Sequence, residues 1–138
     1  MNDTIKKLIK QYEKNGDFNY ASVTDEIINS AEQKLNLKLP AEYTDYIKSY
    51  GHGGIAGIEI LGVGLTGRLL FVDTTLEYRQ EDLPLNLVVI ENIDEYLVCI
   101  DCNNNKIVSW DFTGFINEEA DSFDEYLIEQ MNNAIENL

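Results

Sequence analysis

Three strand-like runs in the middle of the chain are separated by links of only four residues. The runs cover Leu87–Glu91, Tyr96–Asp101 and Lys106–Trp110, and each is rich in the branched and aromatic residues that favour strands. A parallel connection needs a crossover of a dozen or more residues, so these short links predict an antiparallel meander. An earlier apolar run, Ile55–Leu61, predicts a further strand, followed by a loop over Gly62–Gly67.

Helical patterns precede these strands. Apolar residues recur at helical spacing over Ile5–Tyr12, and Thr24 is placed to cap a second helix. Pro40 suits the first turn of a third helix, and Gly51 suits its end because glycine accepts a left-handed backbone.

Two capping boxes predict the remaining helices. Thr74 with Glu77 predicts a short helix that ends before Pro84, and Ser122 with Glu125 predicts a last helix with a continuous apolar stripe. Helices at the two ends and strands in the middle indicate an α+β fold, in which the helices pack on a central antiparallel sheet. A length of 138 residues predicts a single domain, residues 1–138.

The chain carries a strong excess of negative charge. It contains 25 Asp and Glu residues against 10 Lys and Arg, a formal charge of −15. A field of this sign repels phosphate backbones and anionic lipids, and it attracts basic proteins. We therefore expect no direct nucleic-acid or membrane partner and favour a basic protein partner, with a role in solubility alone as the alternative.

The chain ends and the cysteines indicate a cellular compartment. The N-terminal residues lead into an amphipathic pattern rather than an apolar signal core, so we expect a cytoplasmic protein. Cys99 and Cys102 are too few for a disulfide scaffold, and they are expected to be reduced there.

Three motifs resemble chemical sites without their required context. Gly62–Gly67 spells a dinucleotide fingerprint, but the residues after it show no helical period, so we predict a loop. Cys99 and Cys102 form a C-x-x-C at a strand end, where no helix dipole stabilises a thiolate and too few further ligands exist for zinc. The run from Asp101 begins like a calcium loop but has Lys106 where glycine is required. His52 has no nucleophile at a recognised spacing. We expect no cofactor, no metal and no catalytic residue.

Acidic and aromatic side chains alternate around the predicted strands. Tyr and Trp are common anchors of protein interfaces, and carboxylates there match Lys and Arg of a partner. For each residue, a solvated acid or a core aromatic is the alternative interpretation. The candidate partner-binding residues are Glu77, Tyr78, Glu91, Asp94, Glu95, Tyr96, Trp110 and Asp111.

An ordered set of motifs resembles a known superfamily. It opens with Leu35-x-Leu37-x-Leu39-Pro40-x-x-Tyr43-x-x-Tyr46-Ile47-x-x-Tyr50-Gly51-x-Gly53-Gly54 and continues through Gly57, Leu87–Glu91, Cys99-x-Asp101 and Val108-x-Trp110-Asp111. These motifs resemble the SUKH superfamily, which is related to a yeast cell-wall-synthesis regulator, and most of all the YobK-type immunity proteins of Bacillus.

The resemblance implies a cytoplasmic antitoxin with no enzyme activity. Such a protein binds and blocks the C-terminal toxic domain of a cognate secreted toxin, often a nuclease, which fits the acidic charge. Two alternatives remain: a general protein-binding scaffold without a toxin partner, and a small-molecule enzyme that uses the Gly62–Gly67 loop or a carboxylate pair.

Overall fold

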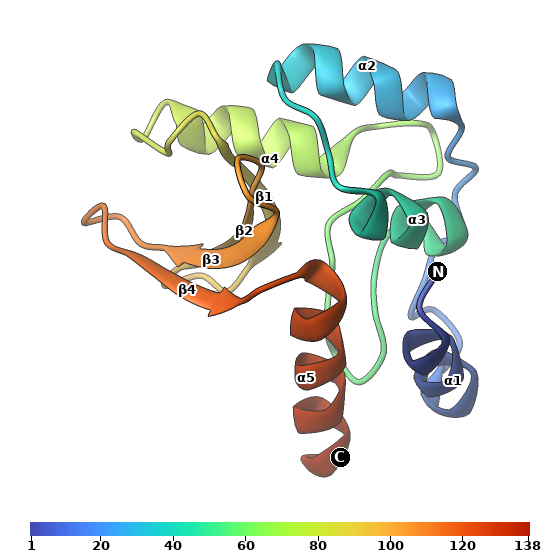
Figure 1. Ribbon diagram of the computed structural model, residues 1–138. Coiled ribbons are helices and arrows are strands. Elements are labelled where there is room, and N and C mark those ends of the chain that lie inside the picture. Colours follow the sequence, from blue (N-terminus) through green and yellow to red (C-terminus); the bar gives the residue numbers. More distant parts are fainter.

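The computed structural model describes all residues 1–138 and confirms an α+β fold, with helices packed on an antiparallel sheet (Figure 1). The helices are α1 (Asp3–Tyr12), α2 (Asp25–Leu35), α3 (Ala41–Tyr50), α4 (Leu70–Arg79) and α5 (Phe123–Glu136). The strands are β1 (Leu87–Asn92), β2 (Leu97–Asp101), β3 (Lys106–Trp110) and β4 (Ile116–Ala120). None of the helices is long and apolar enough to span a membrane.

The sheet is a meander with the strand order β1-β2-β3-β4, in which every neighbouring pair is antiparallel. The pairing is irregular within β1 and near the end of β4, where register shifts mark bulges. Bulges increase the local twist, and the sheet is strongly curled (Figure 1). The predicted meander is therefore confirmed for β1 to β3 and extends by one strand.

Apolar side chains cover both faces of β1 to β3. Alternate residues such as Val98 and Ile100 join the main core beneath the helices, whereas Leu97 and Cys99 join a smaller cluster on the opposite face. Successive strand residues point to opposite faces, so a strand with two buried faces appears as a continuous apolar run. Helix α5 contacts α1, α3, β3 and β4, and α4 lies against β1.

The predicted caps of α2 and α5 are confirmed. The backbone N–H of Ile27 donates to Thr24 Oγ1 at 3.2 Å, and that of Glu125 donates to Ser122 Oγ at 3.2 Å. Each side chain satisfies an amide that has no partner within its helix. Both helix starts were therefore encoded locally.

The predicted start of the mid-chain helix was wrong. Helix α4 begins at Leu70, because the carbonyl oxygen of Gly62 accepts from the backbone N–H of Leu70 at 3.0 Å and of Phe71 at 3.4 Å. This cap comes from a loop rather than from Thr74, and the helix ends at Arg79. The amphipathic period expected of a helix was hidden because the start of α4 is apolar and largely buried.

One strand prediction also failed, and one strand was not predicted. Residues Ile55–Leu61 form turns with an isolated bridge between Gly53 and Ile60, since Ala56 (φ 53°) and Gly57 (φ 84°) adopt left-handed conformations that no strand contains. Strand β4 was not predicted from the sequence. Its residues Ile116–Glu119 are all exposed, so β4 lacks the apolar alternation that identifies a half-buried strand.

Candidate protein-interaction surface

The negative charge of the protein is concentrated in the second part of the chain. Residues 80–138 hold 14 Asp and Glu against one Lys, a formal charge of −13, whereas residues 1–79 hold 11 acids and nine bases, a formal charge of −2. The second part supplies the whole sheet and α5. The segment that forms the sheet and α5 is therefore strongly acidic, whereas the segment that forms α1 to α4 is nearly balanced.

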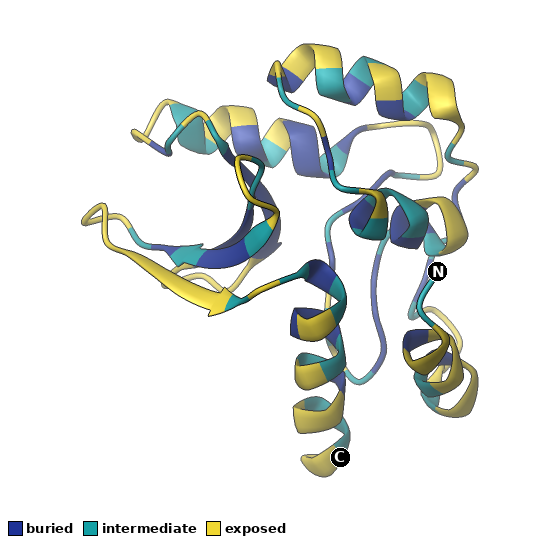
Figure 2. Cartoon of the chain, viewed as in Figure 1, coloured by how far each residue is buried: buried dark blue, intermediate teal, exposed yellow.

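The acids gather most densely where β4 meets α5. A depression of about 330 Å³ there is lined by Glu118, Glu119, Ala120, Asp121, Glu125 and Glu129. The only base that contacts this group is Lys106, whose Nζ lies 3.3 Å from Glu118 Oε1. β4 and the outward side of α5 are largely exposed (Figure 2). We call the five carboxylates of Glu118, Glu119, Asp121, Glu125 and Glu129 the acidic ridge.

Apolar side chains are exposed beside the acidic ridge, at the β3–β4 hairpin. The exposed fractions are 53% for Phe112, 63% for Phe115 and 47% for Ile116. A second depression, of about 220 Å³, is lined by Tyr96, Ser109, Asp111, Phe115, Asn117 and Glu119. Tyr96 is 39% exposed, so an aromatic rim borders the carboxylates.

Two of the eight candidate partner-binding residues lie inside the protein. Trp110 is 2% exposed, because its position in β3 points into the smaller apolar cluster. Glu91 is 7% exposed, and its Oε1 accepts a hydrogen bond from Tyr126 Oη at 2.6 Å. Neither can supply contact area to a partner in this conformation, which corrects their assignment to the surface.

The burial of Glu91 shifts the pKa of its carboxyl. Burial raises the pKa of the Glu91 carboxyl, and the hydrogen bond from Tyr126 opposes that shift. The pKa of the Tyr126 hydroxyl is raised by burial and by the nearby Glu91 carboxylate. The pair joins α5 to β1.

The other candidates are accessible but differ in what they already contact. Glu77 is exposed, and Tyr78 is half-buried with its ring centroid 5.7 Å from that of Phe112. Asp94 and Glu95 are exposed in the turn between β1 and β2, next to Tyr96. These acids have no positively charged partner within the protein.

Asp111 holds the hairpin loop together. Its Oδ1 accepts from the backbone N–H of Thr113 at 2.9 Å, the hydroxyl of Thr113 at 2.5 Å and the N–H of Phe115 at 3.3 Å. The hydrogen bond from the Thr113 side chain is the main cause that lowers the pKa of Asp111, and the two backbone bonds add to it. Its carboxylate thus shapes the loop that presents Phe112 and Phe115.

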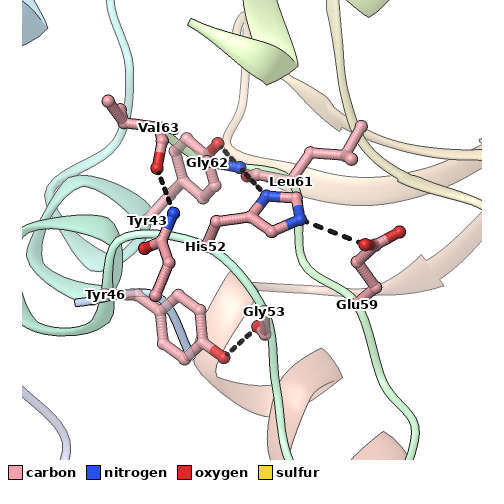
Figure 3. A network of polar contacts seen from close by, with 9 residues as sticks. Tyr43, Tyr46, His52, Gly53, Glu59, Leu61, Gly62 and Val63 are labelled. Atoms are coloured by element: carbon pink, nitrogen blue, oxygen red, sulfur yellow. Dashed lines mark hydrogen bonds and ion pairs between the residues drawn. The ribbon is translucent and has the colours of Figure 1, made fainter. Parts of the chain in front are cut away.

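His52 belongs to a structural network rather than to a reactive group (Figure 3). Its Nδ1 accepts from the backbone N–H of Gly62 at 3.1 Å, so in this geometry the proton resides on Nε2, which lies 3.1 Å from Glu59 Oε2. Nearby, Tyr43 Oη donates to the carbonyl of Leu61 at 2.6 Å. The network fixes the loop that follows α3.

The Gly62–Gly67 loop closes on itself. The carbonyl of Gly62 accepts hydrogen bonds from the first free backbone N–H groups of α4. The N–H of Gly64 donates to the carbonyl of Arg68 at 2.8 Å. The helix that the fingerprint requires does exist, contrary to our expectation, but its N-terminus faces a carbonyl rather than an open phosphate site. This geometry favours a structural loop.

The contacts of the two cysteines and of the turn that follows β2 also indicate structural roles. Cys99 is buried and Cys102 half-buried; burial raises the pKa of both thiols, that of Cys102 to about 12. Asp101 Oδ1 accepts from the backbone N–H of Asn103 at 3.0 Å and from Asn86 Nδ2 at 2.9 Å. The structure contains no group of three or more His, Cys, Asp or Glu side chains arranged to hold a metal ion.

The acidic ridge was not predicted from the sequence. The candidate acids lie in α4, in β1 and the turn after it, and at the end of β3, but not in β4 or α5. A signal was available, because residues 107–138 contain no Lys, Arg or His. The strand that carries Glu118 and Glu119 could not be recognised from periodicity, so the clustering of its acids with those of α5 was invisible.

Comparisons with known proteins support the fold. A family model described as SMI1-KNR4 cell-wall, SUKH_5, matches residues 1–132. A solved structure described as the crystal structure of a protein from Pseudomonas syringae pv. tomato matches with a TM-score of 0.72, at 12% identity, over 94% of this chain and 99% of that chain. At this identity the structural likeness shows the fold alone, whereas the family model confirms the resemblance seen in the motifs. The chain belongs to the SUKH superfamily.

Proposed function

We propose that this protein is an immunity protein, which binds and neutralises the toxic C-terminal domain of a cognate secreted toxin. The observation that carries the proposal is the concentration of charge: residues 80–138 account for −13 of the formal −15, and they form the whole sheet and α5. Membership of the SUKH superfamily is consistent with it, since that superfamily includes immunity proteins.

The sign of the charge indicates the kind of toxin. A nuclease must be basic where it holds nucleic acid, and an acidic protein can occupy that groove in place of the substrate. The acidic ridge offers five carboxylates with one lysine among them. We infer that the toxic domain is a nuclease and that these carboxylates pair with its Lys and Arg.

The proposed contact surface has a charged part and an aromatic part. The acidic ridge and the exposed acids Asp94 and Glu95 would attract and orient the toxin, while Tyr96 and Phe115 would supply desolvated contact area. Glu77 and Tyr78 extend the surface across Phe112. Trp110 and Glu91 act only from within, by supporting this surface.

The test is co-purification with the toxic domain encoded beside this protein, followed by a nuclease assay over a range of salt concentrations. We expect a tight complex with loss of nuclease activity, and association that slows as salt rises. An active nuclease that does not bind would overturn the proposal and would favour a scaffold that binds other cellular proteins.

Matched charge reversals test which surface of the protein binds the toxin. Glu118→Lys with Glu129→Lys should slow association by about tenfold at low salt, because long-range attraction depends on where the charges lie. Asp3→Lys with Glu26→Lys changes the net charge equally but on the α1 and α2 side, and it should slow association much less. Equal slowing by both pairs would contradict a role for the acidic ridge.

A further inference from the structure

The outer edge of β4 is open. β4 is the last strand of the sheet and pairs only with β3. No backbone hydrogen bond outside the sheet ladder involves residues 116–120, and no side chain bonds to their backbone. The N–H and C=O groups on that edge are therefore free to pair with another strand.

This edge lacks some of the features that protect natural edge strands. Ile116–Ala120 contains no Lys and no Pro, and β4 is exposed over Ile116–Glu119 (Figure 2). A bulge lies near the end of β4, between Glu118, which pairs with Val108, and Ala120, which pairs with Ile107. The remaining protection is negative charge, from Glu118 and Glu119.

Negative charge selects which strands can pair there. If two copies of this chain joined through β4, their Glu118 and Glu119 side chains would face each other, and like charges across a strand pair are destabilising. The formal charge of −15 adds a general repulsion between copies. The same carboxylates attract a strand that carries Lys or Arg.

The surroundings of the edge fit a basic extended segment. Glu118 lies opposite Val108 on the face of the smaller apolar cluster, whereas Glu119 bonds to Ser109 Oγ at 2.9 Å on the α5 face. Basic side chains on either face of an added strand would therefore meet a carboxylate. On the α5 side, Glu125 and Glu129 line the same depression.

We propose that β4 accepts a short basic strand of a partner protein as a fifth strand of the sheet. Backbone hydrogen bonds supply the pairing, and Lys or Arg side chains of the added strand pair with Glu118, Glu119 and the α5 acids. The proposal refines the proposed function, which identifies the partner as a toxic domain. It can be tested without that domain, because the pairing depends only on this edge.

The probe is a short synthetic peptide of alternating lysine and valine, added to the ¹⁵N-labelled full-length protein. We expect chemical-shift changes centred on residues 116–120, and slower hydrogen exchange of the outward amides of β4, because pairing protects them. The control peptide has the same sequence with N-methyl groups on alternate residues, which keeps the charge and removes the donors needed for pairing.

The outcomes separate pairing from simple charge attraction. Slower exchange with the first peptide but not with the N-methylated one supports the proposal. Equal shifts with both peptides and no change in exchange would overturn it, as would shifts located elsewhere, self-association of the protein, or no binding up to millimolar peptide. Toxin inhibition that fails while the peptide still pairs would remove the proposed function and leave this inference standing.

A charge-reversed variant provides the second test. Glu118→Lys with Glu119→Lys should weaken binding of the lysine–valine peptide by at least about tenfold and should create binding of a glutamate–valine peptide. Both residues are exposed, so the variant is expected to fold. Unchanged peptide preference would contradict the charge selection proposed for this edge.

Discussion

The two edge strands of the sheet have opposite surroundings. The edge of β1 is closed: the N–H of Val89 donates to Thr75 Oγ1 at 2.9 Å, and the carbonyl of Ile90 accepts from the N–H of Leu61 at 2.8 Å. Every residue of β1 except Asn92 is buried, whereas Ile116–Glu119 of β4 are exposed. The fold thus satisfies one edge from within and leaves the other to water or to a partner. If the proposed strand pairing at β4 is right, stability and partner contact depend on opposite edges of one sheet.

The largest effect is expected at the closed edge. Thr75 is fully buried, and its hydroxyl donates to the carbonyl of Phe71 at 2.7 Å while it accepts from Val89. Thr75→Val keeps the shape and leaves the Val89 amide buried without an acceptor, which should lower the free energy of unfolding by about 1–3 kcal/mol. Urea unfolding measures the change.

Two controls sharpen this prediction. Thr75→Ser retains the hydroxyl and should recover most of the lost stability. Ser109→Val removes a hydroxyl beside the open edge, where the bond to Glu119 is exposed, and should change stability by no more than about 0.5 kcal/mol. Equal losses in Thr75→Val and Ser109→Val would break the distinction between the two edges.

Glu91 is the one acid of the closed edge, and it should cost stability at neutral pH. Its pKa in the folded protein is raised by burial above the ordinary value of 4.5, so the folded state binds more protons than the unfolded state in the pH range between about 4.5 and the folded pKa. Its contribution to stability therefore falls as pH rises through that window and is constant above the folded pKa.

Glu91→Gln keeps an acceptor for Tyr126 and removes the charge. We expect it to raise the free energy of unfolding at neutral pH by a few tenths to about 1 kcal/mol. The advantage over the native protein should grow from about pH 4.5 to neutral pH. An advantage that is independent of pH, or largest in acid, would show that the Glu91 carboxyl is not destabilised by burial.

The contrast between the edges also explains what the sequence could predict. β2 and β3 were recognisable because Val98, Ile100 and Ile107 belong to long apolar runs, and α2 and α5 because their caps lie within three residues of the amides they satisfy. These signals are local. They indicated the sheet, its direction of pairing and most helix boundaries.

The errors arose where distant residues decide the outcome. β4 exists because it pairs with β3, not because its own residues favour a strand. Helix α4 starts at Leu70 because a carbonyl eight residues earlier accepts its amides. The buried Glu91 accepts its hydrogen bond from Tyr126, 35 residues later. A single sequence does not display these contacts, so the candidate surface was partly misplaced.

A smaller and local effect is expected in the hairpin that leads to the open edge. Asp111→Ala removes the acceptor for the amides of Thr113 and Phe115, so these amides should exchange several-fold faster while the rest of the sheet is unaffected. Asp111→Asn retains an acceptor and should exchange at close to the native rate.

The lowered pKa of Asp111 fixes the direction of the pH dependence. Its bonds stabilise the ionised form, so their contribution is present above the ordinary value of 3.8 and is lost as pH falls through the lower folded pKa. Amide exchange at Thr113 and Phe115, corrected for the intrinsic pH dependence, should show the hairpin loosening only in strong acid. Loosening near neutral pH would contradict the role assigned to this carboxylate.

The smallest effect on folding is expected in the acidic ridge itself. Asp121 and Glu129 are exposed and make no hydrogen bond or ion pair within the protein, while other carboxylates surround them. Asp121→Asn with Glu129→Gln should therefore leave the free energy of unfolding within about 0.5 kcal/mol of the native value, with a slight gain at low salt as repulsion is relieved. The same variant should show a weaker salt dependence of association with a basic partner, because fewer charges act at long range. A large loss of stability would mean that the charges beside β4 stabilise the fold, as the hydrogen bonds at β1 do. That result would contradict the proposal that stability and partner contact depend on opposite edges of the sheet.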